Sequence, residues 1–242
     1  MHRRQSIGAS GPHERVESGD PARRARTGVS MEYVRLSYRA NRGWPWPDDS
    51  FGLTPMYGND GWCRSCGIPK RPQSGSLVLR RRGLTGRSSW VPNWLFDVIC
   101  LEQSVADELV DAFDIPVRKI EWKGRGSGPR EASQIVAPTV GESWFSEAEL
   151  AEATARHHGP GRTGARCLEC GVWRWYPLVD WLLPPLRIRP GLGNVPVAAS
   201  PEWFGDGLKA FREILIRRDL AESLVQSSNG ELGILEIGRL AP

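Results

Sequence analysis

The sequence of 242 residues lacks a long uninterrupted apolar run. Its two most apolar stretches, residues 91–100 and 176–186, are broken by proline and aspartate and fall well short of a membrane span. The N-terminal arginines are not followed by the apolar core of a secretory signal. We therefore expect no membrane segment and a cytoplasmic location, where thiols stay reduced.

The sequence also lacks the patterns of common catalytic sites. It has no nucleophile elbow, Walker A loop, His-Glu-x-x-His helix or dinucleotide fingerprint. Only four histidines are present, and His2 and His13 lie near the N-terminus. The pair His157-His158 ends a predicted helix, where a cationic cap is a simpler interpretation than a metal ligand or general base. We predict that the protein is not an enzyme, with dispersed catalytic groups as the alternative.

Excess positive charge is concentrated at the N-terminus. Residues 1–29 contain six arginines and three acidic residues, which supply +3 of the net charge of +4. Their Gly, Ser, Pro and Arg content predicts a disordered basic tail. The remainder is nearly neutral, which argues against a uniformly basic nucleic-acid-binding surface. Patterned sequence begins at Met31, so we expect either that Met31 is the true start or that the tail is dispensable.

Four of the five cysteines form two copies of one pattern. The sequence Cys63-x-x-Cys66-Gly67 returns as Cys167-x-x-Cys170-Gly171, with 100 residues between Cys66 and Cys167. In such a turn the two thiolates converge, and the glycine permits the backbone conformation that the turn needs. Two turns supply the four ligands of a tetrahedral site. We predict structural Zn²⁺ bound by Cys63, Cys66, Cys167 and Cys170, with no open position for catalysis.

Alternatives to zinc remain for these cysteines. Reduced Cys-x-x-Cys pairs favour metal or redox chemistry over disulfides, so independent redox pairs, an iron–sulfur cluster and a vestigial site stay open. A redox pair requires a low-pKa cysteine at a helix N-terminus. The residues after the two motifs, 67–69 and 171–173, favour a knuckle over a helix. Cys100, in an apolar segment, is interpreted as a small buried hydrophobe.

Hydrophobic periodicity predicts an α+β fold of short elements. The predicted strands are residues 32–39, 77–79, 94–100, 115–122, 172–176, 195–198 and 233–237. One helix follows residue 100, with Ser104 as its cap, and a second begins at the capping box Ser146–Glu149. A third helix is predicted from Ser200, because Ser-Pro-Glu starts helices and an apolar stripe follows. That stripe is Phe204, Leu208, Phe211 and Leu215.

The predicted elements repeat in order along the chain. Each knuckle is followed about thirty residues later by an apolar strand that enters an amphipathic helix. We predict two related lobes, residues 30–125 and 126–242, divided at a glycine-rich linker and joined by the four-cysteine zinc knuckle pair.

Eleven tryptophans are a large number for this length. Core packing is one interpretation, and a protein interface is the other, because residues 44–47 and 90–94 place rings in rigid, proline-containing loops. The candidate partner-binding residues are Trp44, Trp46, Trp90, Trp94, Arg80, Arg81 and Arg82. The three arginines are interpreted first as a solvated strand end, then as a contact to an acidic partner and last as a phosphate contact.

The paired motifs, followed by a terminal Ser-Pro-Glu-Trp-Phe segment and a strand, resemble the bacterial double-CXXCG motif family from about Met31 onward. The resemblance is specific at the four paired cysteines, Gly67 and Gly171. Some members of that family are described as immunity proteins that neutralise a cognate toxin. The resemblance therefore implies a non-enzymatic protein whose partner is a toxin. The alternative is a nucleic-acid-binding zinc-ribbon protein that uses the knuckles and the basic tail.

Overall fold

The structure is a computed structural model that describes residues 32–38, 45–81, 88–125, 131–178, 182–187, 192, 195–205 and 209–237. Contacts between residues group Met31–Pro242 into one unit and Met1–Ser30 into another. The predicted tail, Trp44 and Arg82 lie outside the described residues.

A four-stranded antiparallel sheet combines the two ends of the described chain, in the order β11-β1-β10-β9. Its strands are β1 (Tyr33–Tyr38), β9 (Val197–Ala199), β10 (Ile214–Arg217) and β11 (Leu232–Leu235). Helix α4 (Arg218–Ser227) follows β10 directly. Its buried residues Leu220, Ala221 and Leu224 recur at helical spacing, so one face of the helix packs into the core.

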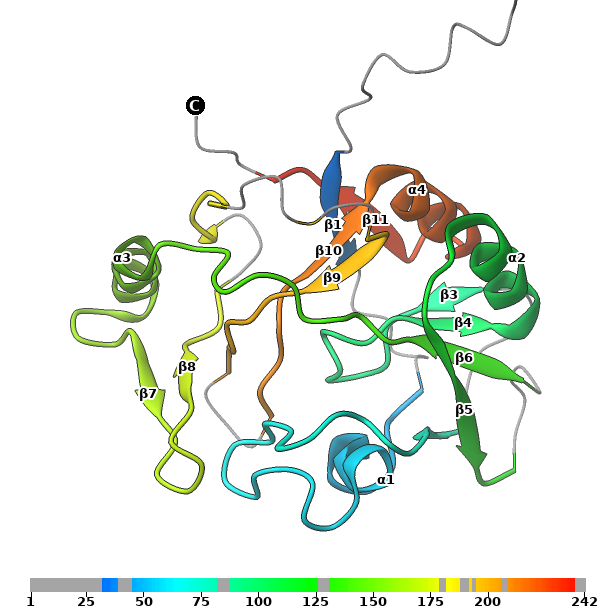
Figure 1. Cartoon of the computed structure of the whole chain (residues 1–242), viewed down its shortest axis with the longest axis horizontal. Coiled ribbons are helices and arrows are strands. Elements are labelled where there is room, and N and C mark those ends of the chain that lie inside the picture. The colour runs from blue at the N-terminus through cyan, green and yellow to red at the C-terminus, as the bar shows by residue number, and fades with distance from the viewer. Residues whose placement is uncertain are drawn as a thin grey trace, which may run out of the picture. The chain divides into compact units, whose positions relative to one another are not determined.

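A five-stranded sheet is formed by the middle of the chain, in the order β2-β5-β6-β4-β3. Its strands are β2 (Leu77–Arg80), β3 (Ser89–Trp90), β4 (Cys100–Glu102), β5 (Val117–Lys123) and β6 (Ala132–Ile135). Strands β2 and β5 are parallel, and the other pairs are antiparallel. Helix α2 (Gln103–Phe113) follows β4 and contacts α4, beside which it lies in Figure 1.

The remaining elements surround the two cysteine turns. A 3-10 turn, η2 (Ser50–Gly52), and helix α1 (Leu53–Tyr57) precede the first turn, and the hairpin of β7 (Gly164–Arg166) and β8 (Trp173–Trp175) encloses the second. Helix α3 (Glu147–His158) precedes that hairpin. Within the described ranges, no helix combines the length and apolar character needed to cross a membrane.

The α+β class and most predicted elements are confirmed. Six of the seven predicted strand regions overlap observed strands, namely β1, β2, β5, β8, β9 and β11. The cap of α3 is also as predicted, because the amide of Glu149 donates to Ser146 Oγ at 3.5 Å. The predicted cap of α2 is wrong. Its N-cap is Glu102, and Ser104 Oγ donates a hydrogen bond to the Glu102 carboxylate.

The predicted strand at residues 94–100 is largely wrong. Turns occupy positions 93–94 and 96–97, and only Cys100 begins a strand. Trp94 has a positive φ of 63°, a conformation that breaks a strand and is rare for a bulky residue. The apolar side chains are buried by a folded loop, which periodicity does not distinguish from a strand.

The predicted helix from Ser200 to Leu215 is wrong. Phe204 and Phe211 exchange two backbone hydrogen bonds of 2.9 Å, and their rings stack at 5.9 Å. The polar residues that resemble a helix start serve a loop instead, because Ser200 Oγ accepts from an amide across it. The Glu202 carboxylate likewise accepts from two amides of another segment, at 2.6 and 3.2 Å. Leu208 lies outside the described residues.

The predicted boundary between the lobes, at residues 125 and 126, does not separate the strands of one sheet from those of the other. Strand β6 follows that boundary but belongs to the five-stranded sheet, and β1 precedes it but belongs to the four-stranded sheet. One apolar core includes Val34 and Val197 of one sheet and Leu77 and Leu101 of the other. The arrangement of two related lobes therefore stays a prediction, in which these strands cross the proposed boundary.

Candidate metal centre

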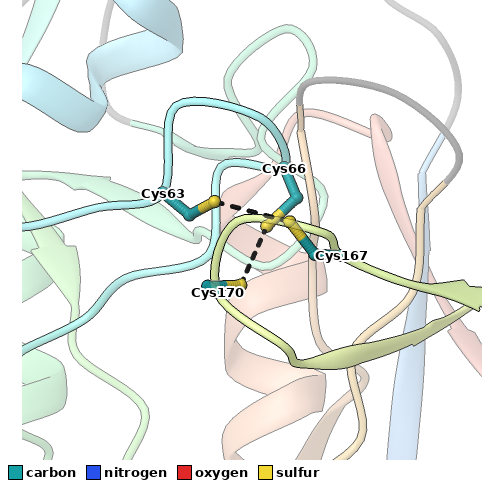
Figure 2. Close-up of side chains that lie close together, drawn as sticks. All are labelled: Cys63, Cys66, Cys167 and Cys170. Carbon is teal, nitrogen blue, oxygen red and sulfur yellow. Dashed lines mark hydrogen bonds between the residues drawn. The ribbon is translucent and has the colours of Figure 1, made fainter.

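The four paired cysteines converge on one point, as Figure 2 shows. The first pair lies between α1 and β2, and the second lies in the turn between β7 and β8. The Sγ atoms of Cys63 and Cys167 are 3.6 Å apart, as are those of Cys66 and Cys170. All four sulfurs lie within 4.8 Å of one another. Within the described ranges, this is the one group of potential ligand side chains placed to hold an ion.

The two turns share one backbone geometry. In each, the first cysteine amide donates to the carbonyl five residues later, and the glycine amide donates to the first cysteine carbonyl. These bonds measure 2.9 and 2.8 Å in the first turn (Cys63, Ile68, Gly67) and 2.9 and 2.9 Å in the second (Cys167, Val172, Gly171). The glycines have φ values of 74° and 73°. Only glycine adopts this left-handed conformation readily, which explains its position after each pair.

The sulfur positions fit a tetrahedral metal ion. Zinc–sulfur bonds of about 2.3 Å place the four sulfurs of a tetrahedron about 3.8 Å apart. The observed closest separations of 3.6 Å agree with that spacing. A disulfide requires about 2.05 Å, and all five cysteines are free thiols. Four thiolates would complete the coordination shell and leave no position for a reactive water.

A bound cation would change the protonation of the sulfurs. Burial raises the pKa of the Cys63 and Cys66 thiols. The pKa of Cys167 is lowered to about 6, chiefly because the Cys170 amide donates to its sulfur. One thiolate is therefore readily formed, while burial opposes ionisation of its neighbours. A divalent cation among the sulfurs would favour deprotonation of all four, so metal binding would release protons.

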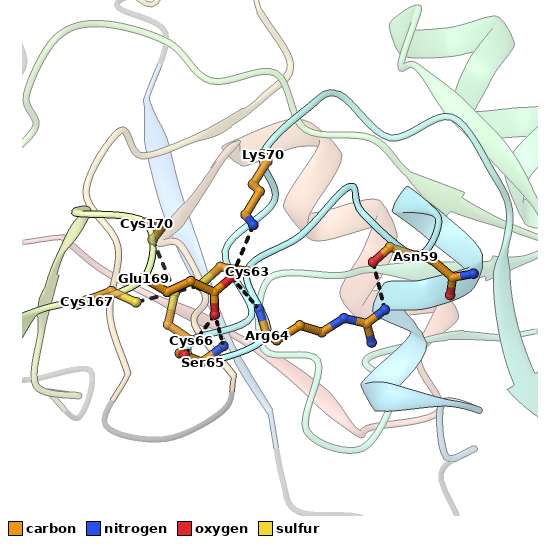
Figure 3. A network of polar contacts seen from close by, with 9 residues as sticks. All are labelled: Asn59, Cys63, Arg64, Ser65, Cys66, Lys70, Cys167, Glu169 and Cys170. Atoms are coloured by element: carbon orange, nitrogen blue, oxygen red, sulfur yellow. Dashed lines mark hydrogen bonds and ion pairs between the residues drawn. The ribbon is translucent and has the colours of Figure 1, made fainter.

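Glu169 links the two turns outside the sulfur cluster (Figure 3). Its carboxylate accepts from Ser65 Oγ at 2.8 Å, from the Ser65 amide at 3.1 Å and from the Arg64 amide at 3.4 Å. Lys70 Nζ pairs with it at 3.1 Å. The Ser65 hydrogen bond, followed by that of Lys70, lowers the Glu169 pKa to about 2. Ser65 and Glu169 occupy the same position in the two turns, so the contact joins equivalent residues.

Sequence reasoning did not identify Glu169. A signal was present, because the acidic Glu169 lies inside one turn, whereas Arg64 lies inside the other and Lys70 follows it. Opposite charges on the two turns favour contact once the sulfurs bring the turns together. Sequence spacing alone does not show that they meet.

Apolar side chains shield the sulfurs. Ile68 and Ala210 are buried beside the cysteines, and Val172 and Trp203 pack against them. Trp203 belongs to the segment that was predicted to be a helix. This environment limits water access and strengthens electrostatic interactions within the site.

The candidate partner-binding tryptophans differ in exposure. Trp46 is 40% exposed and Trp94 is 54% exposed, so both are on the surface. Trp90 is 1% exposed and stacks with Trp122 at 6.3 Å between ring centroids. Its proposed role as a surface contact is wrong, because it forms part of the core.

The candidate arginines have contacts within the protein. Arg80 Nε lies 3.2 Å from Asp48, whose carboxylate also pairs with Lys123. The Arg81 guanidinium lies 5.6 Å from the centre of the Trp122 ring. These contacts within the chain explain the positions of both side chains, so no partner protein is needed to explain them. Arg80 nevertheless remains exposed.

The other residues considered as chemical groups have structural surroundings. Nε2 of His158 lies 2.7 Å from the Pro177 carbonyl, and its ring lies 5.4 Å from that of Tyr176. Cys100 is fully buried, which raises its thiol pKa well above the ordinary value. This environment agrees with the interpretation of Cys100 as a small apolar residue.

The chain was compared with known proteins at the level of sequence. A scan against protein-family models gives no match, and a search of curated proteins gives no similar sequence. Function must therefore be inferred from the residues and their geometry.

Proposed function

We propose that this chain is a non-enzymatic, zinc-stabilised protein that binds and neutralises a cognate bacterial toxin. The observation that supports it most is the convergence of two Cys-x-x-Cys-Gly turns, in which cysteines 104 positions apart come within 3.6 Å. Zn²⁺ at this point would join two related lobes as a knuckle pair. An all-sulfur site would stabilise the fold and provide no open coordination position.

Zinc is favoured by the donor set and by its surroundings. Four convergent sulfurs suit a tetrahedral, borderline-soft ion, and the apolar cover is typical of a structural site. An ion bound only by the folded chain adds its binding free energy to folding. The gain is largest where the ligands close a long loop, since loop closure is unfavourable in the unfolded chain.

Partner binding is supported by exposed aromatic residues on loops. Trp46 and Trp94 are both surface residues, and Trp94 has a strained backbone conformation that displays its ring. Tryptophan is enriched among the residues that dominate protein–protein affinity. A preformed surface of this kind would occlude the active site or substrate path of a toxin, with charges setting the orientation.

Native mass spectrometry of the protein purified under reducing conditions tests the metal. We expect one zinc ion per chain, lost in a Cys63→Ser variant and retained in Cys100→Ala, which removes a thiol away from the cluster. A metal-free wild-type chain would contradict the proposed site. An absorption spectrum typical of iron–sulfur proteins would contradict zinc and assign an iron–sulfur cluster to the four cysteines.

Co-expression tests the function. We expect the chain to restore growth of cells that produce the toxin encoded beside its own gene, and Trp94→Ala to weaken the complex by about tenfold or more in calorimetry. Trp90→Phe is the control, because that ring is buried. Failure of rescue would count against immunity. Salt-dependent nucleic-acid binding that persists without residues 1–29 would favour the zinc-ribbon alternative.

A further inference from the structure

A cavity of about 550 Å³ opens beside the four-stranded sheet, and none of the four paired cysteines lines it. It lies between strands β1 and β10, the loop at residues 91–99 and the loop that carries Lys209 and Phe211. Its volume is within the range of about 300–1,000 Å³ that small organic ligands occupy in proteins. The proposed partner surface shares Trp94 with the rim of this cavity but assigns no role to the cavity itself.

Aromatic rings form one continuous wall of the cavity. Phe96 stacks on Tyr38 at 6.0 Å and meets Phe211 edge to face at 5.4 Å and Trp94 at 6.1 Å. Trp94, Phe96 and Tyr38 are 54%, 38% and 36% exposed. A cluster of large exposed apolar side chains commonly marks a binding site. The strained φ of 63° at Trp94 lies at the rim of this wall.

Two cations lie at the other side of the cavity. The Lys209 side chain is 11% exposed, and its Nζ lies 4.0 Å from Asp97, outside ordinary hydrogen-bond distance. Burial lowers the Lys209 pKa to about 8, so the amine is still mainly charged at pH 7. Arg212 also lines the cavity, and its buried Nε has no acceptor among the described residues. Arg212 Nη1 instead donates to the neutral Thr139 hydroxyl.

The charge balance at the cavity is positive. Arg35 and Glu213 both line it and pair with each other. Asp97, which also accepts from the Arg212 amide at 3.3 Å, offsets one of the two remaining cations. One positive charge of the lining is left without a carboxylate, and the Arg212 guanidinium also lies 5.2 Å from the centre of the Trp203 ring.

We propose that this cavity binds a small aromatic carboxylate. The ring would pack on Phe96 and Phe211, and the carboxylate would accept from Arg212 and pair with Lys209. Such a ligand neutralises the excess positive charge of the lining and places its ring against the aromatic wall. A neutral aromatic ligand would satisfy only the apolar wall, and a cationic one would meet like charge. The proposal does not depend on zinc or on toxin binding.

Three probes with one aromatic body test the assignment: 1-naphthoate, 1-naphthalenemethanol and 1-naphthylmethylamine. In calorimetry with the full chain at pH 7, we expect the carboxylate to bind about tenfold or more tightly than either the alcohol or the amine. This comparison uses the wild-type protein, so it does not depend on how any variant folds. Equal affinities for the three probes, or no binding of the carboxylate, would overturn the proposal.

A charge-removing variant locates the carboxylate. Lys209→Met keeps the length of the side chain and is expected to reduce naphthoate affinity at least about fivefold while leaving the alcohol unchanged. Lys119→Met is the matched control, because it removes an exposed lysine that pairs with Glu131 elsewhere. Unchanged naphthoate binding in folded Lys209→Met would overturn the placement. Tighter binding of an acetylated Phe-Glu amide than of naphthoate would overturn the small-molecule assignment in favour of a partner peptide.

Discussion

Individual residues in this protein are constrained by backbone conformation and by charge. Gly67 and Gly171 adopt the same left-handed conformation at equivalent places in the two cysteine turns. Lys209 is a cation held largely away from water, with Asp97 as its nearest carboxylate partner. These residues illustrate separate constraints, one steric and one electrostatic, and each can be tested by a single substitution.

Substitution of Gly171 should measure how much the left-handed backbone conformation at this position contributes to stability. A Cβ atom at this position would meet no atom within 4 Å, so a clash is not expected. The φ of 73° alone should make Gly171→Ala less stable by about 1 kcal/mol, and Gly171→Asn by less. Urea unfolding of the metal-loaded proteins measures this difference. Equal stability of Gly171→Ala and wild type would contradict the left-handed turn.

Lys209 should make stability depend on alkaline pH. Burial lowers its pKa from 10.5 to about 8, so between these values the unfolded chain binds more protons than the folded chain. The contribution of Lys209 to the free energy of unfolding is therefore lowest below about pH 8 and rises as the pH approaches 10.5. The stability of wild type relative to Lys209→Met should increase by more than about 1 kcal/mol over this interval. Denaturant titrations at pH 7.5 and 10 test this, and a constant difference would contradict the burial of the charged amine.

At the scale of secondary-structure elements, similar polar residues begin a helix in one segment and stabilise a loop in another. Ser146 caps α3 as its sequence pattern indicates. Ser200 and Glu202 instead accept hydrogen bonds from amides of other segments, and the described residues from 201 to 205 are not helical. The same chemistry serves both purposes, because orphan amides occur at helix ends and in loops alike. Glu169 is a third case, because this residue of the second cysteine turn accepts hydrogen bonds from Ser65 of the first turn.

Glu169→Gln should loosen the metal centre without removing a ligand. The amide retains a carbonyl acceptor but loses the charge that Lys70 and the two amides contact. We expect zinc affinity to fall by about three- to tenfold, at the lower end of effects from outer contacts because the carboxylate is partly exposed. Competition with a chromophoric chelator measures the affinity. Glu131→Gln is the control, and equal zinc affinity of Glu169→Gln and wild type would show that the contact does not support the site.

At the scale of the whole molecule, interactions between distant segments hold residues 31–242 together. The first strand pairs with the last two, and one apolar core joins residues of both sheets. The cysteine cluster adds a second long-range connection, between positions 104 apart. A metal ion bound by this cluster would be a cross-link, which stabilises the folded state chiefly by restricting the unfolded chain.

Metal removal should lower the melting temperature of the whole chain. Chelation under reducing conditions is expected to lower the Tm by at least about 5 °C, because loss of a bound ion removes several kcal/mol. Cys63→Ser and Cys167→Ser should show similar losses, since each removes one ligand from the same ion. Differential scanning calorimetry measures the Tm, with Cys100→Ala reported with and without chelator as the control. A Tm that chelation leaves unchanged would contradict a structural metal.

The predicted elements that were correct depend on local patterns. Residues 32–39 alternate in polarity and form β1, and residues 146–157 carry both a cap and helical spacing and form most of α3. The errors at residues 94–100 and 200–215 have one cause, because apolar residues there are buried by loops whose course is set by distant partners. Phe204 and Phe211 are seven positions apart, which fits a helix as well as the observed bridge.

The sequence by itself determined the four convergent cysteines, the glycines after them and most of the strands, because these depend on residue type and short spacing. Only the tertiary structure decided that Trp90 is buried, that Glu169 joins the turns and that Lys209 and Arg212 face an aromatic cavity. Each of those features is a contact between segments far apart in the chain. Such contacts depend on how the sheets and loops pack together, and a local pattern of residue types does not specify that packing.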